Sequence, residues 1–190
     1  NLSANGNVVE MLDAVQQSIM SANLQLTQQA AAYDSQRVPG STVVVLIING
    51  DQGAIVWAGD SRIYRRRDHV VTQLTRDHSH VQDLVEQGVI LESEAESHPM
   101  ANVITRAVGI SEPLELESKW IDVREDDQFL LCSDGLSRLV NNEELATMMD
   151  NRDNEEVTRS LLHTALVRGA RDNVPLICVK NCPDSDGLNK

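Results

Sequence analysis

The sequence has 190 residues, 41% of them hydrophobic, which is enough for one ordinary globular domain with a buried core and too little to favour two. Its formal net charge of −13, from 29 acidic and 16 basic residues, argues against nucleic acid or an anionic membrane surface as the main partner. No apolar run reaches the roughly 18 residues of a membrane span, and the cysteines lack metal-ligand spacing, which indicates reduced thiols of a cytoplasmic protein.

The first predicted element is an amphipathic helix over residues 8–26. Its apolar residues recur at intervals of four and three, which places them on one helical face: Val8, Leu12, Val15, Ile19, Ala22 and Leu26. A break is expected at Pro39-Gly40. Two β-branched runs follow, 43–48 and 54–58, around Asn49-Gly50-Asp51. Because Asn-Gly tolerates positive φ, we expect a hairpin with a type I′ turn.

A second hairpin is predicted from residues 62–66 and 70–74 around Asp68-His69. Between 77 and 109 the pattern becomes short and mixed. It predicts a helix at 81–87 ended by Gly88, a second helix capped by Ser93, and a stop at Pro99. This stretch is interpreted as a small subdomain laid on a sheet.

The last third of the chain returns to regular elements. Strands are predicted at 114–123 and 128–133, helices at 142–150 and 154–168, and a strand at 174–179. The polar tail 183–190 is expected to be disordered. Helices grouped apart from hairpin-linked strands predict an α+β layered domain rather than a doubly wound parallel sheet.

Three aspartates stand where apolar runs give way to turns: Asp60, Asp134 and Asp172. A carboxylate at a strand end beside glycine can face a common cleft, because the backbone there approaches closely. Converging carboxylates repel one another unless a cation lies between them, and oxygen-only ligands suit Mg²⁺ or Mn²⁺. The alternative is that each Asp-Gly or Asp-Ser pair only forms a turn. For Asp51 and Asp68 we adopt that alternative outright.

Six motifs occur in order along the chain. They are Gly40-Ser41-Thr42, Ala58-Gly59-Asp60-Ser61-Arg62, residues 74–79 (Leu-Thr-Arg-Asp-His-Ser), residues 102–109, residues 130–136 with Ser133-Asp134-Gly135, and Ala170-Arg171-Asp172-Asn173. In this order the chain resembles the bacterial PPM (type 2C) metal-dependent protein serine/threonine phosphatases. The resemblance extends over residues 8–179. The sequences of residues 57–64 and 78–109 resemble those of the branch associated with type VI secretion.

The resemblance implies a four-layer α-β-β-α sandwich with a cleft that holds two Mn²⁺ or Mg²⁺ ions. It implies that Asp134 and Asp172 are ligands of the paired metals, and that Asp60 joins Asp134 at a third, weaker metal position. It further implies that Asn173 and Ser133 lie next to the metal ligands without binding the metal, with Asn173 holding a water or orienting Asp172. Residues 77–109 would be a flap beside the cleft. The implied activity is hydrolysis of phosphoserine and phosphothreonine in proteins phosphorylated by a Ser/Thr kinase, by a monomeric cytoplasmic enzyme.

Two family elements do not occur in this sequence: an Arg that binds substrate phosphate, and the Asp-Gly-Met-Gly-Gly-type turn whose Asp bridges the metals. Both belong before the first helix, so the expectation is a single catalytic domain over 1–182 truncated at its N-terminus. The catalytic residues proper are therefore left unassigned. The alternative is an inactive phosphatase-like module kept for binding or regulation.

Other reactive residues carry less weight. His78 lies in a polar loop motif, so we interpret it as a structural residue rather than an acid or base. Ser61 and Ser133 lack a His-Asp partner pattern, which argues against a serine-nucleophile hydrolase. The run Arg65-Arg66-Arg67 is interpreted as a solvated hairpin face, with phosphate binding as the alternative.

Overall fold

The computed structural model describes residues 7–32, 40–150 and 152–182. They belong to two compact units. The first contains Asn1–Ser61 and Arg76–Ile121, and the second contains Arg62–Thr75 and Asp122–Lys190. The predicted break at Pro39 and the predicted tail at 183–190 lie outside the described residues. Within the described ranges, no helix has both the length and the apolar character needed to cross a bilayer.

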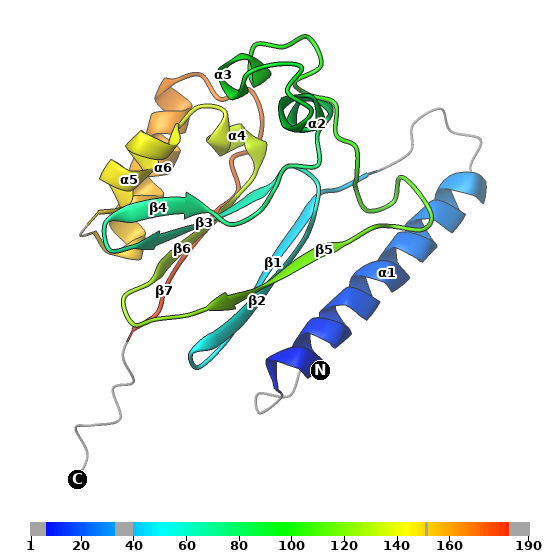
Figure 1. Cartoon of the computed structure of the whole chain (residues 1–190), viewed down its shortest axis with the longest axis horizontal. Coiled ribbons are helices and arrows are strands. Elements are labelled where there is room, and N and C mark those ends of the chain that lie inside the picture. The colour runs from blue at the N-terminus through cyan, green and yellow to red at the C-terminus, as the bar shows by residue number, and fades with distance from the viewer. Residues whose placement is uncertain (1–6, 33–39, 151, 183–190) are drawn as a thin grey trace. The chain divides into compact units, whose positions relative to one another are not determined.

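The first unit is a helix packed on a three-stranded sheet (Figure 1). Helix α1 (Val8–Ala32) lies along the sheet, whose strand order is β1 (Val43–Asn49), β2 (Gln52–Ala58), β5 (Glu117–Asp122). Val8 and Leu12 of the helix bury against Ile47, Ala54 and Val56. The predicted helix is confirmed and extends to Ala32, beyond its last apolar stripe residue.

The first hairpin is confirmed, but its predicted turn type is wrong. Asn49 pairs with Gln52, so Gly50 and Asp51 are the two loop residues. Only Gly50 has a positive φ, of 63°, which is the pattern of a type II′ turn with Gly in the first central position. The Asn-Gly pair is therefore shifted by one residue, because Asn49 remains in the strand ladder.

The segment from 77 to 109 contains two short helices, α2 (His80–Glu86) and α3 (Glu92–Ala95). Ser79 caps α2 by accepting a hydrogen bond from the backbone N–H of Gln82 at 3.3 Å. The predicted cap at Ser93 is wrong, because Ser93 lies inside α3. Glu94 instead reaches back and accepts from the backbone N–H of Leu91 at 2.8 Å. A glutamate in the first turn can satisfy a free amide as well as serine.

The second unit has a four-stranded antiparallel sheet covered by helices (Figure 1). The strand order is β4 (Val70–Gln73), β3 (Arg62–Arg67), β6 (Gln128–Cys132), β7 (Leu176–Lys180). The helices are α4 (Asp134–Ser137), α5 (Asn142–Met149) and α6 (Asn154–Val167). The core joins Tyr64 and Leu130 of the sheet to Leu145 and Leu161 of the helices. The α+β class is confirmed, since each unit, taken by itself, has one sheet and its own helices.

The second predicted hairpin is confirmed, whereas the strand predicted at 114–123 is only partly correct. In the second hairpin, Arg67 pairs with Val70, and the loop residues Asp68 and His69 have φ of 49° and 65°. Both central residues are thus left-handed, as a type I′ turn requires. The predicted strand at 114–123 is too long: β5 begins at Glu117, and Leu114 packs outside the sheet in a small core. Its apolar character reflects burial, not strand pairing.

Candidate metal centre

Asp134 stands where β6 ends and α4 begins. Ser133 precedes the helix with extended backbone (φ −80°, ψ 171°), and Asp134 is the first helical residue. Three of the β6 residues before it, Gln128, Phe129 and Leu130, are no more than 1% exposed, whereas the Asp134 side chain is 37% exposed. A rigid, buried strand therefore presents this carboxylate to solvent at its end.

Asp172 and Asn173 lie in the loop between α6 and β7, and this loop is in contact with the Asp134 turn. A Cβ added to Gly135 would stand 2.4 Å from the carbonyl oxygen of Asn173. The backbone N–H of Ser133 donates to the carbonyl oxygen of Pro175 at 3.3 Å. The two segments that carry Asp134 and Asp172 are therefore held together through their backbones, and only glycine at 135 leaves room for this approach.

Each of the two carboxylates has a partner within the protein. Asp134 Oδ2 lies 3.0 Å from Arg138 Nη2, one helical turn later. Asp172 Oδ1 accepts from the backbone N–H of Asn173 at 2.7 Å. The Arg138 partner was missed at the level of sequence, although Asp and Arg four residues apart are the signal for such a pair on a helix. It was missed because α4 itself was not predicted.

Ser133 is half-buried, and its hydroxyl oxygen has no hydrogen-bond partner. A buried hydroxyl without a partner is costly unless something absent from the protein chain satisfies it. It lies directly beside Asp134. This orphaned oxygen is the observation that points to a bound ion or its water at the turn.

The donor chemistry of the turn fits a hard divalent cation. Carboxylate, hydroxyl and amide oxygens of Ser133, Asp134, Asp172 and Asn173 are the ligands that Mg²⁺ and Mn²⁺ prefer. Among the residues that the structure describes, however, no group of three or more His, Cys, Asp or Glu side chains could hold a metal. The chain therefore presents part of a ligand set around this turn.

Asp60 belongs to the first unit, where it follows β2. It is only 7% exposed. Gly59 before it has a φ of 116°, and a Cβ there would lie 2.6 Å from Cβ of Thr42. Thr42 Oγ1 and Ser61 Oγ are 2.9 Å apart. The Gly-Ser-Thr motif and the Gly-Asp-Ser motif are therefore packed against each other, so that the Asp60 turn has a defined backbone path.

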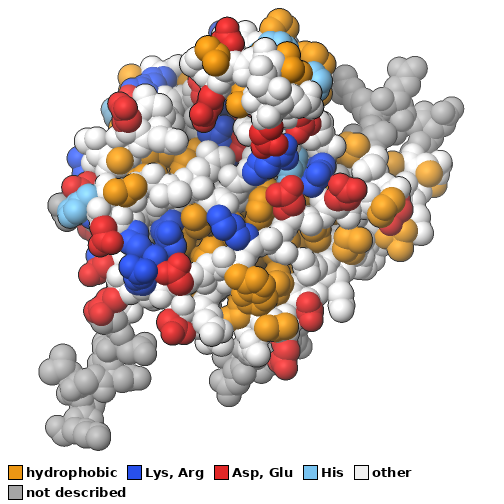
Figure 2. Space-filling model, in the orientation of Figure 1, with side chains coloured by type: hydrophobic (Ala, Val, Ile, Leu, Met, Phe, Trp, Pro, Cys, Tyr) orange, Lys and Arg blue, Asp and Glu red, His pale blue; other side chains and the backbone are white. Residues whose placement is uncertain are grey.

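The arginines of β3 are engaged in ion pairs. Arg66 Nη2 lies 2.7 Å from Asp150 Oδ1, and Arg67 Nη1 lies 2.6 Å from Asp122 Oδ2. Arg65 lies 3.5 Å from the same Asp122. On the face drawn in Figure 2, Lys and Arg side chains lie beside Asp and Glu. These pairs favour a structural role of the run over phosphate binding, but the predicted solvated face is wrong, because the three side chains are only 12–19% exposed.

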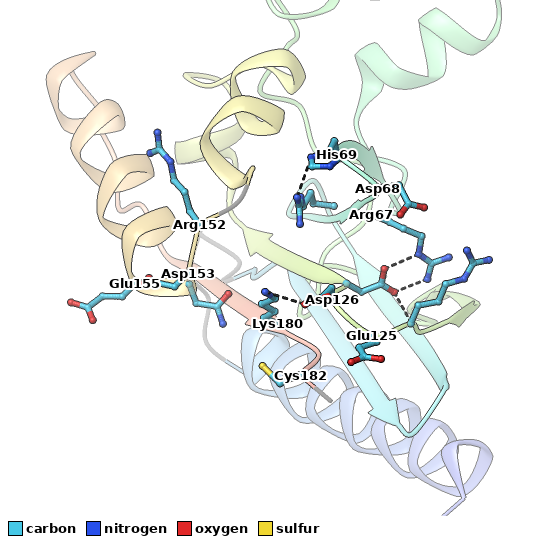
Figure 3. Close-up of a pocket in the computed structure, with 14 residues that line it drawn as sticks. Arg67, Asp68, His69, Glu125, Asp126, Arg152, Asp153, Glu155, Lys180 and Cys182 are labelled. Carbon is cyan, nitrogen blue, oxygen red and sulfur yellow. Dashed lines mark hydrogen bonds and ion pairs between the residues drawn. The ribbon is translucent and has the colours of Figure 1, made fainter. Parts of the chain in front are cut away.

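A pocket of about 950 Å³ lies at the other end of the second sheet (Figure 3). It is lined by the end of β3, the turn before β6 and the end of β7, whereas Asp134 and Asp172 lie at the opposite strand ends. Two of its cations pair with acids that also line it, Arg67 with Asp127 at 2.6 Å and Lys180 with Asp126 at 3.2 Å. The pocket is therefore separate from the candidate metal centre.

The family model "Protein phosphatase 2C" matches residues 2–168. The serine/threonine protein phosphatase PstP of Mycobacterium tuberculosis is 33% identical over 172 residues, which cover 90% of this chain. The chain spans 33% of the length of that relative.

Two solved structures share the fold. PppA, described as a key regulatory component of T6SS in Pseudomonas aeruginosa, is 38% identical, with a TM-score of 0.85 over 95% of this chain and 74% of that one. The catalytic domain of PstP in complex with two manganese ions is 30% identical, with a TM-score of 0.80 over 95% and 74% of the two chains. The chain belongs to the protein phosphatase 2C (PPM) family of metal-dependent serine/threonine phosphatases.

Proposed function

We propose that this chain contributes to a Mn²⁺- or Mg²⁺-dependent protein phosphatase that hydrolyses phosphoserine and phosphothreonine. The observation that carries the proposal is the backbone contact between Gly135 and Asn173, which holds the segments of Asp134 and Asp172 together. The manganese ions in the related PstP structure support the choice of metal.

Each polar residue at the turn has a proposed role. Asp134 and Asp172 would hold the paired cations, and Asp60 would serve a third, weaker position. The backbone N–H of Asn173 already donates to Asp172 Oδ1, which orients that carboxylate. The free hydroxyl of Ser133 would bond to a ligand water. When bound, such cations polarise phosphoryl oxygens and lower the pKa of the water that attacks phosphorus.

Arg138 is proposed to stabilise the turn when no cation is bound. Its ion pair with Asp134 is about one-third exposed on both sides, so it contributes little to stability, on the order of 0.5 kcal/mol. A divalent cation that binds Asp134 replaces this weak pair at small cost.

The substrate and setting are also proposals. The implied substrate is a protein phosphorylated by a Ser/Thr kinase, and the likeness to PppA supports the branch associated with type VI secretion. Cys132, Cys178 and Cys182 are free thiols, which supports a reducing cytoplasm. A monomer is proposed, with residues 1–182 as one catalytic domain and 77–109 as its flap.

The test is hydrolysis of p-nitrophenyl phosphate and of a phosphothreonine peptide, with and without Mn²⁺. It should be made with this chain and with the protein encoded by its full natural reading frame. Asp134→Asn and Asp172→Asn should each lower metal-dependent hydrolysis at least about a hundredfold. Asp68→Asn is the matched control, because Asp68 is an exposed carboxylate in a left-handed turn that Asn also tolerates.

The alternative function is a phosphatase-like module that binds a partner without catalysis. The absence of a group of three acidic or other metal-binding side chains among the described residues favours it. It predicts that neither polypeptide hydrolyses phosphate esters with Mn²⁺. That result would overturn the phosphatase proposal.

A further inference from the structure

His78, in the neighbouring loop, makes two hydrogen bonds with Gly59 in the turn that carries Asp60. The backbone N–H of Gly59 donates to Nδ1 of His78 at 3.1 Å, and the backbone N–H of His78 donates to the carbonyl oxygen of Gly59 at 3.0 Å. Both backbone groups of the residue before Asp60 therefore bind one residue. His78 is completely buried.

The ring orientation of His78 is set by its neighbours. Its imidazole stacks on Trp57, with centroids 6.0 Å apart and an interplanar angle of 15°. Trp57 Nε1 in turn donates to the carbonyl oxygen of Arg76 at 2.8 Å. The stack fixes the plane of the imidazole, and with it the direction of the Nδ1 lone pair toward Gly59.

The protonation of the ring follows from its contacts. Because Nδ1 accepts a hydrogen bond, the proton of the neutral imidazole is on Nε2. Nε2 has no hydrogen-bond partner, but Oε1 of the Glu117 carboxylate lies 3.1 Å from it. Arg106 Nη1 donates to the same carboxylate oxygen at 3.1 Å. Glu117 thus favours the tautomer that leaves Nδ1 free to accept.

We infer that His78 is a positioning residue for Asp60: it fixes the Gly59 peptide and thereby the direction in which the Asp60 carboxylate leaves the end of β2. The inference rests on the proposed function, in which Asp60 is a metal ligand. It goes beyond a packing role because the two hydrogen bonds hold both peptide groups of Gly59, the second of which leads into Asp60. Thr42 also packs tightly against Gly59, since a Cβ on Gly59 would lie 2.4 Å from Cγ2 of Thr42.

Two variants of His78 separate the positioning role from simple packing. His78→Leu removes both ring nitrogens. His78→Asn places Oδ1 near the position of Nδ1, so that the Gly59 N–H keeps an acceptor. Leu12→Ala is the control for stability, because Leu12 lies in the α1–sheet core of the same unit and takes no part in the Asp60 turn. Asp60→Asn reports the loss of the ligand itself.

Two measurements on the metal-binding protein carry the test: Mn²⁺ affinity by titration calorimetry, and exchange of the Gly59 amide hydrogen. His78→Leu should weaken the weakest Mn²⁺ site about tenfold, as loss of a residue that orients a ligand typically does. It should also speed exchange of the Gly59 amide. His78→Asn should restore most of both, and Leu12→Ala should leave Mn²⁺ affinity unchanged.

The outcomes distinguish this inference from the proposed function. If Asp60→Asn abolishes a Mn²⁺ site and His78→Leu leaves that site intact, the positioning role is overturned and the phosphatase proposal stands. If His78→Leu and Leu12→Ala weaken Mn²⁺ binding equally, the effect is one of stability and the inference fails. If the wild-type protein binds no Mn²⁺ and hydrolyses no phosphate ester, both are wrong.

Discussion

Gly135 is the residue at which the two candidate ligand loops meet. Replacing it with alanine would put a Cβ 2.4 Å from the Asn173 carbonyl oxygen, a backbone atom that cannot move alone. We expect Gly135→Ala to lower the free energy of unfolding by about 2 kcal/mol through overpacking. The urea midpoint of unfolding checks this. It should also weaken Mn²⁺ binding, because the loops are pushed apart.

Gly50→Ala is the control for this substitution. Gly50 has a positive φ and open space around it, so alanine there costs only backbone strain, about 1 kcal/mol. It should leave Mn²⁺ binding unchanged. A Gly135→Ala protein as stable as Gly50→Ala would contradict the close approach of the loops.

His78 gives a second prediction at the scale of single residues, in the pH dependence of stability. Burial lowers the pKa of His78 from the usual 6.5, and the charges of Arg106 and Arg76 lower it further, whereas Glu117 opposes them. Below pH 6.5 the unfolded chain therefore takes up a proton that the folded one resists. This part of the stability is complete above about pH 6.5 and is lost as the pH falls toward the folded pKa.

The measurement is the free energy of unfolding from about pH 7.5 to about pH 5 for the wild type and for His78→Asn. The wild-type curve should fall more steeply on acidification, because asparagine does not titrate. Parallel curves would show that His78 is readily protonated in the folded protein. That result would also remove the basis for its assigned tautomer.

Strand β3 is joined to the turn before β6 by a buried ion pair. Arg67 Nε and Nη2 donate to the two oxygens of Asp127 at 2.7 and 2.6 Å, and Asp127 also accepts from the backbone N–H of Arg124. The Asp127 side chain is fully buried, and that of Arg67 is 15% exposed. The hydrogen bond to Asp127 is the largest cause that raises the pKa of Arg67 above its usual value.

Asp127→Ala should therefore destabilise the protein by about 3 kcal/mol, because it leaves Nε of the largely buried Arg67 and the backbone N–H of Arg124 without their acceptor, although Asp122 still pairs with Arg67. Denaturant unfolding followed by circular dichroism measures the loss. Arg65→Ala is the matched control: its partner Asp122 is 60% exposed, so the change should stay within about 1 kcal/mol. Equal losses for the two variants would contradict this account.

At the level of elements, most helices and strands followed from local pattern, and their errors have local causes. The stripe that begins at Val8 predicted α1, and the β-branched runs around Asn49-Gly50 predicted the first hairpin. The second hairpin was predicted from residues 62–66 and 70–74 around Asp68-His69. Helix α4 was missed because four residues are too few to show a period. The predicted cap at Ser93 is wrong because the hydrogen bond from the Leu91 N–H to the Glu94 side chain depends on a backbone path that the sequence does not show.

At the scale of the whole molecule, metal binding should couple to stability. A cation that binds the folded protein alone stabilises it by mass action, by about 2.7 kcal/mol when its concentration is a hundred times the Kd. Mn²⁺ should therefore raise the melting temperature, and should slow hydrogen exchange in residues 133–138 and 170–175 of the second unit. Calorimetry and hydrogen exchange with mass spectrometry measure the two effects.

The double variant Asp134→Asn, Asp172→Asn should show neither effect, while Asp68→Asn should behave as the wild type. If Mn²⁺ stabilises the double variant as well as the wild type, the ion binds elsewhere. Residues 134 and 172 would then lose their proposed role as ligands.

The sequence alone determined the family and the class of fold, because both follow from short motifs and local residue patterns. Six ordered motifs identify the PPM family, and the grouping of helices and hairpins predicts an α+β domain. Asp134 and Asp172 were singled out because they follow or precede apolar runs next to small turn residues. That is information carried by adjacent positions.

Only the tertiary structure decided which of these segments meet. Three contacts join residues far apart in the chain: Gly135 with Asn173, His78 with Gly59, and Arg67 with Asp127. No repeating residue pattern in the sequence predicts these contacts, because each depends on how loops cross at the ends of strands. Packing distances of a few ångströms, which no local pattern encodes, place the candidate ligands.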